Sequence, residues 1–338
     1  MNSIKSNSII IATGDPAGIG TEIILKALYE LKGLKTLDTI IVGCKENINS
    51  EYINLREKGI NNVINPKDLN ILDIPINKKI TERRASAATG NASFKWLQKS
   101  VSLLKKTKAK ALVTAPISKY AWHQAGHFYP GQTELLAELS NAKEVSMLFT
   151  ATSPNNGWRL NTLLATTHIP ISQISSDLTP EKIHSKLNTL LSFCKRFKEK
   201  PKLAIAGLNP HSGEQGQLGN EEQEWLIPTM NKWKALHPTI ELDGPIPPDT
   251  CWIPSANAWE GKTDARIHDG ILAMYHDQAL IPVKLIAFDY AVNTTLGLPF
   301  IRTSPDHGTG FDIAGKGLAR HISMKEAIRA ALELSAKD

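Results

Sequence analysis

The segment LAIAGLNPHSGE, residues 203–214, joins a short apolar run to a turn crowded with polar side chains. Three other segments have the same form: ALVTAPISK at 111–119, LNTLLATTHIP at 160–170 and ILAMYHDQ at 271–278. Longer amphipathic stretches separate them, and this alternation predicts an α/β fold. Loops that follow the carboxyl ends of strands in such a sheet converge on a ligand site.

Apolar spacing and capping residues predict the remaining elements. We expect strands over 8–12, 39–42, 111–113, 160–165, 203–206 and 271–274, and helices over 21–31, 91–106, 180–197 and 324–334. Thr179 and Ser323 are the predicted caps of the last two helices. A chain of 338 residues is long enough for two cores. The expected domains are 1–130 with 290–338, which carries a dinucleotide loop, and 131–289, which carries metal and dimer contacts.

Composition excludes several classes of protein. Hydrophobic residues make up 41% and charged residues 21%, the balance of a soluble globular protein. The net charge of +6 is spread along the chain, which favours a solvated surface over a nucleic-acid footprint. Cys44, Cys194 and Cys251 are widely spaced and predict reduced thiols. With no membrane-length apolar run and no signal peptide in the polar stretch before the first strand, we expect a cytoplasmic protein.

Three of the four polar loops carry one histidine each: His168, His211 and His276. A single histidine is most often a hydrogen-bonded structural side chain. Three at equivalent ends of separate strands predict a catalytic metal centre, because three protein ligands leave a coordination position for substrate.

Two glycine-rich stretches are further candidates for binding. DHGTGFDIAGKG, residues 306–317, has glycines that permit close approach of the backbone to a ligand. GDPAGIG, residues 14–20, joins the first strand to the first helix, where it is either an anion site or a tight structural turn. It matches neither the Walker A pattern nor GxGxxG.

Taken in order, these motifs resemble the 4-hydroxythreonine-4-phosphate dehydrogenase family of pyridoxal phosphate biosynthesis. The matching stretches include GDPAGIG, TAPISK, PGQTELLAEL, TTHIP, GLNPHSGE, GPIPPDT, YHDQALIPVK and the run from VNTTLG to IAGKG, and they extend from about residue 9 to 320. Each motif alone is weak, but eight in order are highly specific. The resemblance implies two α/β domains around a cleft, with a fold similar to isocitrate and isopropylmalate dehydrogenases.

The resemblance also implies an activity and a set of residues. The expected reaction is metal-dependent oxidation of 4-phosphooxy-L-threonine by NAD to 2-amino-3-oxo-4-phosphooxybutanoate, which decarboxylates to 3-amino-2-oxopropyl phosphate. It implies a homodimer in which the partner subunit completes each active site. The implied catalytic residues are Asp249 and Lys284. The substrate residues are Gln132, Thr133, Lys284, Asn293 and Arg302; the cofactor residues are His307, Gly308, Thr309, Asp312, Ala314 and Gly315; the metal ligands are His168, His211 and His276.

One position departs from the family pattern, which has histidine where this chain has Gln132. Glutamine can hold an anion but cannot titrate near neutral pH. A proton shuttle at this position would therefore be lost, whereas a binding role would be kept. His127, five residues upstream, is a candidate replacement.

Some alternatives remain open on the sequence alone. Asp312 predicts NAD over NADP, because a carboxylate on the ribose repels a 2′-phosphate. Zn²⁺ is the expected metal, with Mg²⁺, Co²⁺, Ni²⁺ and Mn²⁺ as alternatives. The rival functions are a paralogous dehydrogenase of phosphorylated threonate or hydroxythreonate, a three-histidine metal hydrolase, and a non-catalytic binding protein.

Overall fold

A computed structural model describes residues 8–34, 37–76, 80, 83–262 and 267–337. The chain divides into two compact units, 1–145 with 292–338 and 146–291. We expected the first boundary after residue 130. The structure places it after residue 145, so helix α5, Gln132–Ser140, belongs to the first unit. The polar stretch before residue 8 lies outside the described residues.

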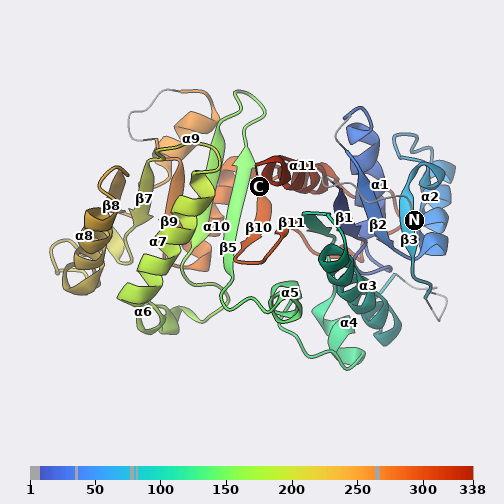
Figure 1. The fold of residues 1–338 in the computed structure, drawn as a ribbon, viewed down its shortest axis with the longest axis horizontal. Coiled ribbons are helices and arrows are strands. Elements are labelled where there is room, and N and C mark those ends of the chain that lie inside the picture. The colour runs from blue at the N-terminus through green and yellow to red at the C-terminus, as the bar shows by residue number, and fades with distance from the viewer. Residues whose placement is uncertain (1–7, 35–36, 77–79, 81–82, 263–266, 338) are drawn as a thin grey trace. The chain divides into compact units, whose positions relative to one another are not determined.

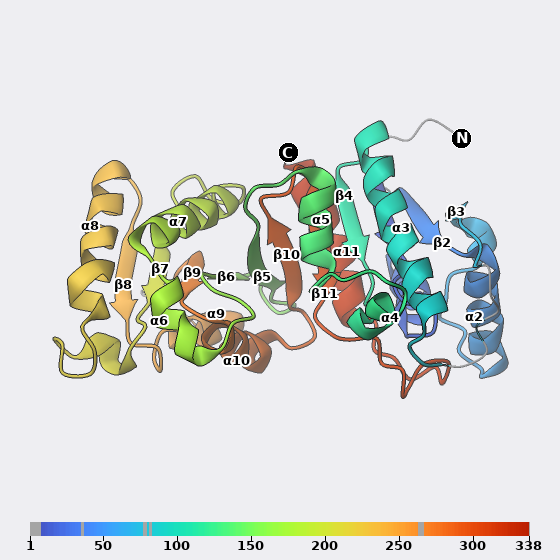
Figure 2. The same cartoon turned by 90° about the horizontal axis from the view of Figure 1, so that it is seen from below.

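The first unit is built on a mostly parallel sheet in the order β3-β2-β1-β4-β11-β10, in which only β10 is antiparallel to its neighbour β11. Helices α3 and α5 cover one face, and α1 and α11 lie on the other (Figures 1 and 2). Its strands are β1 (Ile9–Ala12), β2 (Thr39–Gly43), β3 (Asn70–Asp73), β4 (Ala111–Thr114), β10 (Val292–Leu296) and β11 (Ile301–Pro305). Its helices are α1 (Gly20–Leu31), α2 (Lys45–Glu57), α3 (Ala87–Lys106), α4 (Lys119–Gln124), α5 and α11 (Ile322–Ala336).

The second unit has its strands in the order β5-β6-β9-β7-β8. Strand β5 is antiparallel to β6, and the remaining neighbours are parallel. Apolar side chains of α9 and α10 pack on one face, and α7 packs against β6 and β9 (Figure 2). The strands are β5 (Ser146–Thr152), β6 (Arg159–Leu164), β7 (Leu203–Ala206), β8 (Leu242–Ile246) and β9 (Gly270–Ala273). The helices are α6 (Ile174–Asp177), α7 (Pro180–Cys194), α8 (Ile227–Leu236), α9 (Ile253–Trp259) and α10 (His276–Ala287).

The predicted α/β class is confirmed, with small shifts at element ends. Thr179 caps α7 as expected, because its side chain accepts a hydrogen bond from the Lys182 amide at 3.2 Å. The prediction that Ser323 caps the last helix is wrong. His321 occupies the cap, and the Ser323 hydroxyl instead accepts a hydrogen bond from the Asp306 amide at 3.1 Å.

Among the described residues, no helix combines the length and the apolar character that crossing a membrane requires.

Candidate functional site

The three predicted metal ligands follow three neighbouring strands of the second unit. Strands β6, β9 and β7 are adjacent and parallel, so their carboxyl ends lie at one edge of the sheet. His168 lies four residues beyond β6, His211 lies five beyond β7, and His276 opens α10 after β9. The shared edge inferred from the sequence is therefore present.

Only two of the three imidazoles meet within this chain. The rings of His168 and His276 have centroids 5.5 Å apart. Over the part of the chain that the structure describes, no group of three histidine, cysteine or carboxylate side chains is arranged to hold a metal ion. His211 is two-thirds exposed, on a turn where its backbone takes φ +50°. The three predicted ligands therefore do not come together as one group within the described chain.

The donor chemistry of these residues nevertheless fits a divalent metal. Nδ1 of His276 lies 2.7 Å from the Asp277 carboxylate, and Nδ1 of His211 lies 3.2 Å from that of Glu214. A carboxylate on one ring nitrogen fixes the tautomer that leaves Nε2 free to bind a metal. Two of the three predicted ligands already have this partner.

The two predicted catalytic residues also belong to the second unit. Asp249 is exposed in the turn between β8 and α9, and Lys284 is exposed in the last turn of α10. Both side chains are exposed to solvent.

Arg302 is a buried cation in the first unit. It lies on β11, is 4% exposed, and donates to the hydroxyl of Thr114 at 2.8 and 3.2 Å and to that of Thr295 at 3.1 Å. Burial lowers the pKa of this guanidinium to about 10, with Glu134 opposing that shift. No described carboxylate forms an ion pair with it. A buried guanidinium held only by neutral hydroxyls is suited to an anionic ligand.

Three other predicted substrate residues share the first unit with Arg302. The side-chain amide of Gln132 donates to the Ala115 carbonyl at 3.2 Å, one residue beyond the hydroxyl that holds Arg302. Thr133 follows in the first turn of α5. Oδ1 of Asn293 on β10 is buried without a hydrogen-bond partner in the described structure. An unpaired buried acceptor is costly, and a hydroxyl or amine of a ligand would satisfy it.

His127 does not take the place of the missing histidine at position 132. Its ring stacks on Phe94 with centroids 3.7 Å apart, and its Nε2 lies 3.3 Å from Oδ1 of Asn91. Burial lowers its pKa, with Lys95 adding to the shift. These contacts give His127 a packing role against α3.

The predicted cofactor residues form one surface loop, which we call the dinucleotide loop (residues 306–317). Three of its glycines have positive φ: Gly310, Gly315 and Gly317. His307, Gly308 and Asp312 are exposed, Thr309 and Gly315 are half-buried, and Ala314 is buried. The loop thus offers backbone and polar side chains to a ligand while one apolar residue fixes it to the unit.

The GDPAGIG stretch forms a closed turn beneath that loop. Residues 13–20 are all buried, and the Ile19 amide, at the start of α1, donates to the Thr309 carbonyl at 2.9 Å. A Cβ on Gly18 would lie 2.7 Å from the same carbonyl oxygen. Of the two open alternatives, the structure favours a structural turn, since protein atoms already occupy the position an anion would need.

Some residues around these sites were not singled out from the sequence. Thr114 and Thr295 accept hydrogen bonds from Arg302. The sequence signal for Thr114 was its position as the first residue of TAPISK, where an apolar strand ends. Glu22 and Lys26 are spaced i, i+4, which is typical of an exposed helix pair. They are instead 1% and 8% exposed, and nothing in the local sequence marks that burial.

Comparison with known proteins gives a consistent result. The profile of the family described as "Pyridoxal phosphate biosynthetic protein PdxA" matches residues 21–331. A 4-hydroxythreonine-4-phosphate dehydrogenase of Synechococcus sp. (strain RCC307) is 54% identical over 96% of this chain and 99% of its own length. A D-threonate 4-phosphate dehydrogenase of Pectobacterium atrosepticum is 36% identical over 98% and 100%.

Solved structures show the same relationship. The crystal structure of 4-hydroxythreonine-4-phosphate dehydrogenase from Klebsiella pneumoniae aligns with TM-score 0.80, 34% identity and 99% coverage of both chains. A beta-decarboxylating dehydrogenase from Thermococcus kodakarensis aligns with TM-score 0.53 at 13% identity, over 96% of this chain and 83% of that one. The second likeness concerns the fold alone and agrees with the expected isocitrate/isopropylmalate dehydrogenase-like architecture.

Proposed function

The chain belongs to the pyridoxal phosphate biosynthetic protein PdxA family and is an oxidoreductase, and we propose that it oxidises 4-phosphooxy-L-threonine with NAD. The product, 2-amino-3-oxo-4-phosphooxybutanoate, is a β-keto acid. Such acids lose CO₂ readily because the ketone accepts the resulting charge, so 3-amino-2-oxopropyl phosphate follows. Membership of this oxidoreductase family removes the support for the alternative of a three-histidine metal hydrolase.

The observation that carries the proposal is the buried guanidinium of Arg302. A substrate that bears a phosphate and a carboxylate supplies the charge that this cation lacks. In the proposal Arg302 binds one anionic group, Gln132 and Thr133 donate hydrogen bonds to it, and Asn293 accepts one from the substrate. A non-catalytic binding protein would use the same residues, so activity must be measured directly.

The proposed metal ligands are His168, His211 and His276. A divalent metal on these imidazoles would supply Lewis acidity that lowers the pKa of the substrate hydroxyl. Asp249 is the proposed base for that proton, and Lys284 the proposed cation beside the reacting groups. Three imidazoles favour Zn²⁺, with Mg²⁺, Co²⁺ and Mn²⁺ as alternatives.

A homodimer is part of the proposal, with His211 of the partner subunit completing the metal centre. Two facts support it. His168 and His276 meet while His211 is not grouped with them. Large apolar side chains are also exposed along the helix that His276 opens: Ile281 59%, Leu285 82% and Phe288 64% exposed. Ile281 and Leu285 lie one turn apart on α10 and Phe288 is its C-cap residue, so the three form an apolar face of the kind that protein interfaces cover.

The dinucleotide loop is the proposed site of NAD. Asp312 is exposed there, where a carboxylate would accept hydrogen bonds from the 2′-hydroxyl of the adenosine ribose and repel the 2′-phosphate of NADP. Asp312→Asn should therefore reduce the preference for NAD over NADP, measured as the ratio of the two kcat/KM values. An unchanged ratio would remove Asp312 from cofactor selection.

The direct test is NADH formation from 4-phosphooxy-L-threonine, followed by absorbance with and without a chelator. Chelator-sensitive NADH formation supports both the substrate and the metal. The rival substrate is D-threonate 4-phosphate, on which the Pectobacterium relative is named to act, and it is assayed in parallel. A higher kcat/KM for that substrate would contradict the substrate assignment and keep the reaction class, whereas inactivity on both would contradict the proposal.

A further inference from the structure

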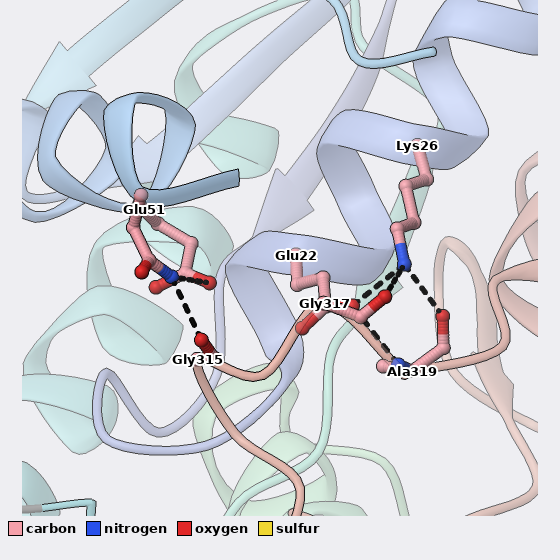
Figure 3. A network of polar contacts seen from close by, with 7 residues as sticks. Glu22, Lys26, Glu51, Gly315, Gly317 and Ala319 are labelled. Atoms are coloured by element: carbon pink, nitrogen blue, oxygen red, sulfur yellow. Dashed lines mark hydrogen bonds and ion pairs between the residues drawn. The ribbon is translucent and has the colours of Figure 1, made fainter. Parts of the chain in front are cut away.

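Two helices of the first unit hold the far end of the dinucleotide loop through buried polar contacts. Nζ of Lys26 on α1 donates to the Gly317 carbonyl at 2.9 Å and to the Ala319 carbonyl at 3.0 Å (Figure 3). The Glu22 carboxylate accepts from Lys26 at 2.6 Å and from the Ala319 amide at 2.9 Å (Figure 3). Gly317 and Ala319 lie 291 and 293 residues beyond Lys26 in the chain, so these contacts are tertiary.

Helix α2 adds a contact to the same end of the loop. The side-chain amide of Asn54 donates to the Gly315 carbonyl at 3.0 Å and lies 3.4 Å from the Glu51 carboxylate. Glu51 in turn pairs with Arg83 at 2.6 Å. The guanidinium of Arg83 also lies beside Gly315, where an added Cβ would be 3.0 Å from its Nε.

The near end of the loop is held separately. The Ile19 amide bonds the Thr309 carbonyl at 2.9 Å, and the Asp306 amide bonds the Ser323 hydroxyl at 3.1 Å. These contacts at both ends bracket the span 310–314, which carries Asp312 and Ala314 of the predicted cofactor residues. The positions of its backbone groups then depend on where the two ends are fixed.

Burying the Glu22–Lys26 ion pair costs free energy, which indicates that the pair does more than fill space in the core. Glu22 and Lys26 are 1% and 8% exposed, and Oε2 of Glu22 is buried with no partner in the described structure. An apolar pair of similar volume would often be as stable as a buried ion pair. The lysine ammonium, with three N–H donors, can donate to two backbone carbonyls and to the carboxylate at once, which an apolar side chain cannot do.

We propose that Glu22, Lys26 and Asn54, which we call the loop anchor, are positioning residues that set the affinity of the dinucleotide loop for NAD. The inference rests on the proposed function of the loop. None of the three is assigned to contact the cofactor. They act by holding the carbonyls of residues 315, 317 and 319, and with them the conformation of the ligand-facing span.

The test uses two variants of the full-length protein. Glu22→Gln with Lys26→Met removes the donors to the loop carbonyls without leaving a lone buried charge, and Asn54→Ala removes one contact at a half-buried position. NAD affinity is measured by calorimetry, and hydrogen exchange of residues 306–320 is measured without cofactor. We expect the Kd for NAD to rise by roughly tenfold in the double variant and about threefold in Asn54→Ala, with faster exchange in the loop.

Lys186→Met is the matched control. Lys186 is also a buried lysine, 6% exposed on α7, where it donates to the Ser146 hydroxyl at 2.7 Å in the other unit. Its loss should lower thermal stability without changing the Kd for NAD or the exchange of the loop. The KM for the phosphorylated substrate should stay within about twofold of wild type in all variants, because the anchor acts on the cofactor.

The outcomes separate the two proposals. Wild-type binding of NAD with unchanged Kd in both anchor variants would overturn the anchor. If the wild type binds no NAD, the proposed function of the loop is overturned instead. In that case, hydrogen exchange of the loop that is faster in the anchor variants but not in Lys186→Met would still support the claim that the anchor fixes the loop's conformation. Unchanged exchange in the anchor variants would overturn that claim too.

Discussion

The buried cation of the first unit and the histidine edge of the second are built in opposite ways. Arg302 is 4% exposed and donates three hydrogen bonds to the hydroxyls of Thr114 and Thr295 in its own unit. The side chain of His211 is 64% exposed and that of His276 38%, and the described residues assemble no three-ligand group. A site whose parts are all present in one chain can be buried by that chain. The exposed imidazoles of the second unit remain accessible to a further ligand, as the proposed metal centre requires.

The largest effect is expected at the histidine edge. His168→Ala and His211→Ala should each lower kcat/KM by about 10³-fold or more, because each removes one metal ligand. If His211 acts from the partner subunit, refolding the two variants together gives one intact centre per mixed dimer. Activity should then return to roughly a quarter of wild type. No recovery, with mixed dimers demonstrated by mass, would mean that His168 and His211 of one centre come from the same chain.

Substitution of Arg302 should have the next largest effect on kcat/KM, and refolding together with a histidine variant should not be needed to interpret it. Arg302→Met should lower kcat/KM for the phosphorylated substrate by about 100-fold, since it removes a charge-assisted contact with the anion. The Kd for NAD should not change. The variant should unfold at no lower a temperature than wild type, because a buried cation without a carboxylate partner is itself costly. A large fall in stability together with normal substrate KM would make Arg302 structural. Arg329→Met, at an exposed ion pair on α11, is the control.

Burial of Asp15, in the turn beneath the dinucleotide loop, should make the stability of the protein depend on pH. Burial raises its pKa to about 6, against opposing hydrogen bonds from the Ala17 amide and Thr89. A carboxyl with a raised pKa stabilises the folded state when protonated, and this contribution is fully present below its ordinary value of 3.8. It is lost as pH rises through about 6. Asp15→Asn should therefore increase stability at pH 7 by up to about 3 kcal/mol, and little at pH 4.

The measurement is urea unfolding of wild type and Asp15→Asn from pH 4 to 8. The curves should converge at the acidic end. A constant difference in the free energy of unfolding across this range would show that Asp15 does not titrate there. Asp38→Asn is the control variant, because it removes another carboxylate that accepts a hydrogen bond from a hydroxyl.

The smallest effect is expected for Gln132→His. In the wild type the Gln132 amide is bonded to the Ala115 carbonyl, so a binding role is already served. The substitution should change kcat/KM by no more than about fivefold and add an acidic limb near pH 6.5 to the pH profile. A much larger gain would indicate that this position moves a proton. Gln124→His on α4, at a residue bonded to Tyr120, controls for an added histidine.

Local patterns located six of the eleven strands that the structure describes, but not β3, β5, β8, β10 or β11. Apolar runs followed by polar turns located β4, β6, β7 and β9 to within one residue at each end, because a buried parallel strand must be apolar and its loop polar. Thr179 was readable as a cap, since capping depends on neighbours in sequence. Ser323 was not, because its hydroxyl bonds the Asp306 amide, far away in the chain.

The sequence by itself determined the α/β class, the family and the residue types at each site. Tertiary structure decided which of them meet: His168 with His276 but not His211, Arg302 with Thr114 and Thr295, and Lys26 with the carbonyls of Gly317 and Ala319 at the end of the dinucleotide loop. The physical reason is range. Strand and helix patterns follow from contacts a few residues apart, whereas burial of a charge depends on segments that are hundreds of residues apart and become neighbours only in the folded chain.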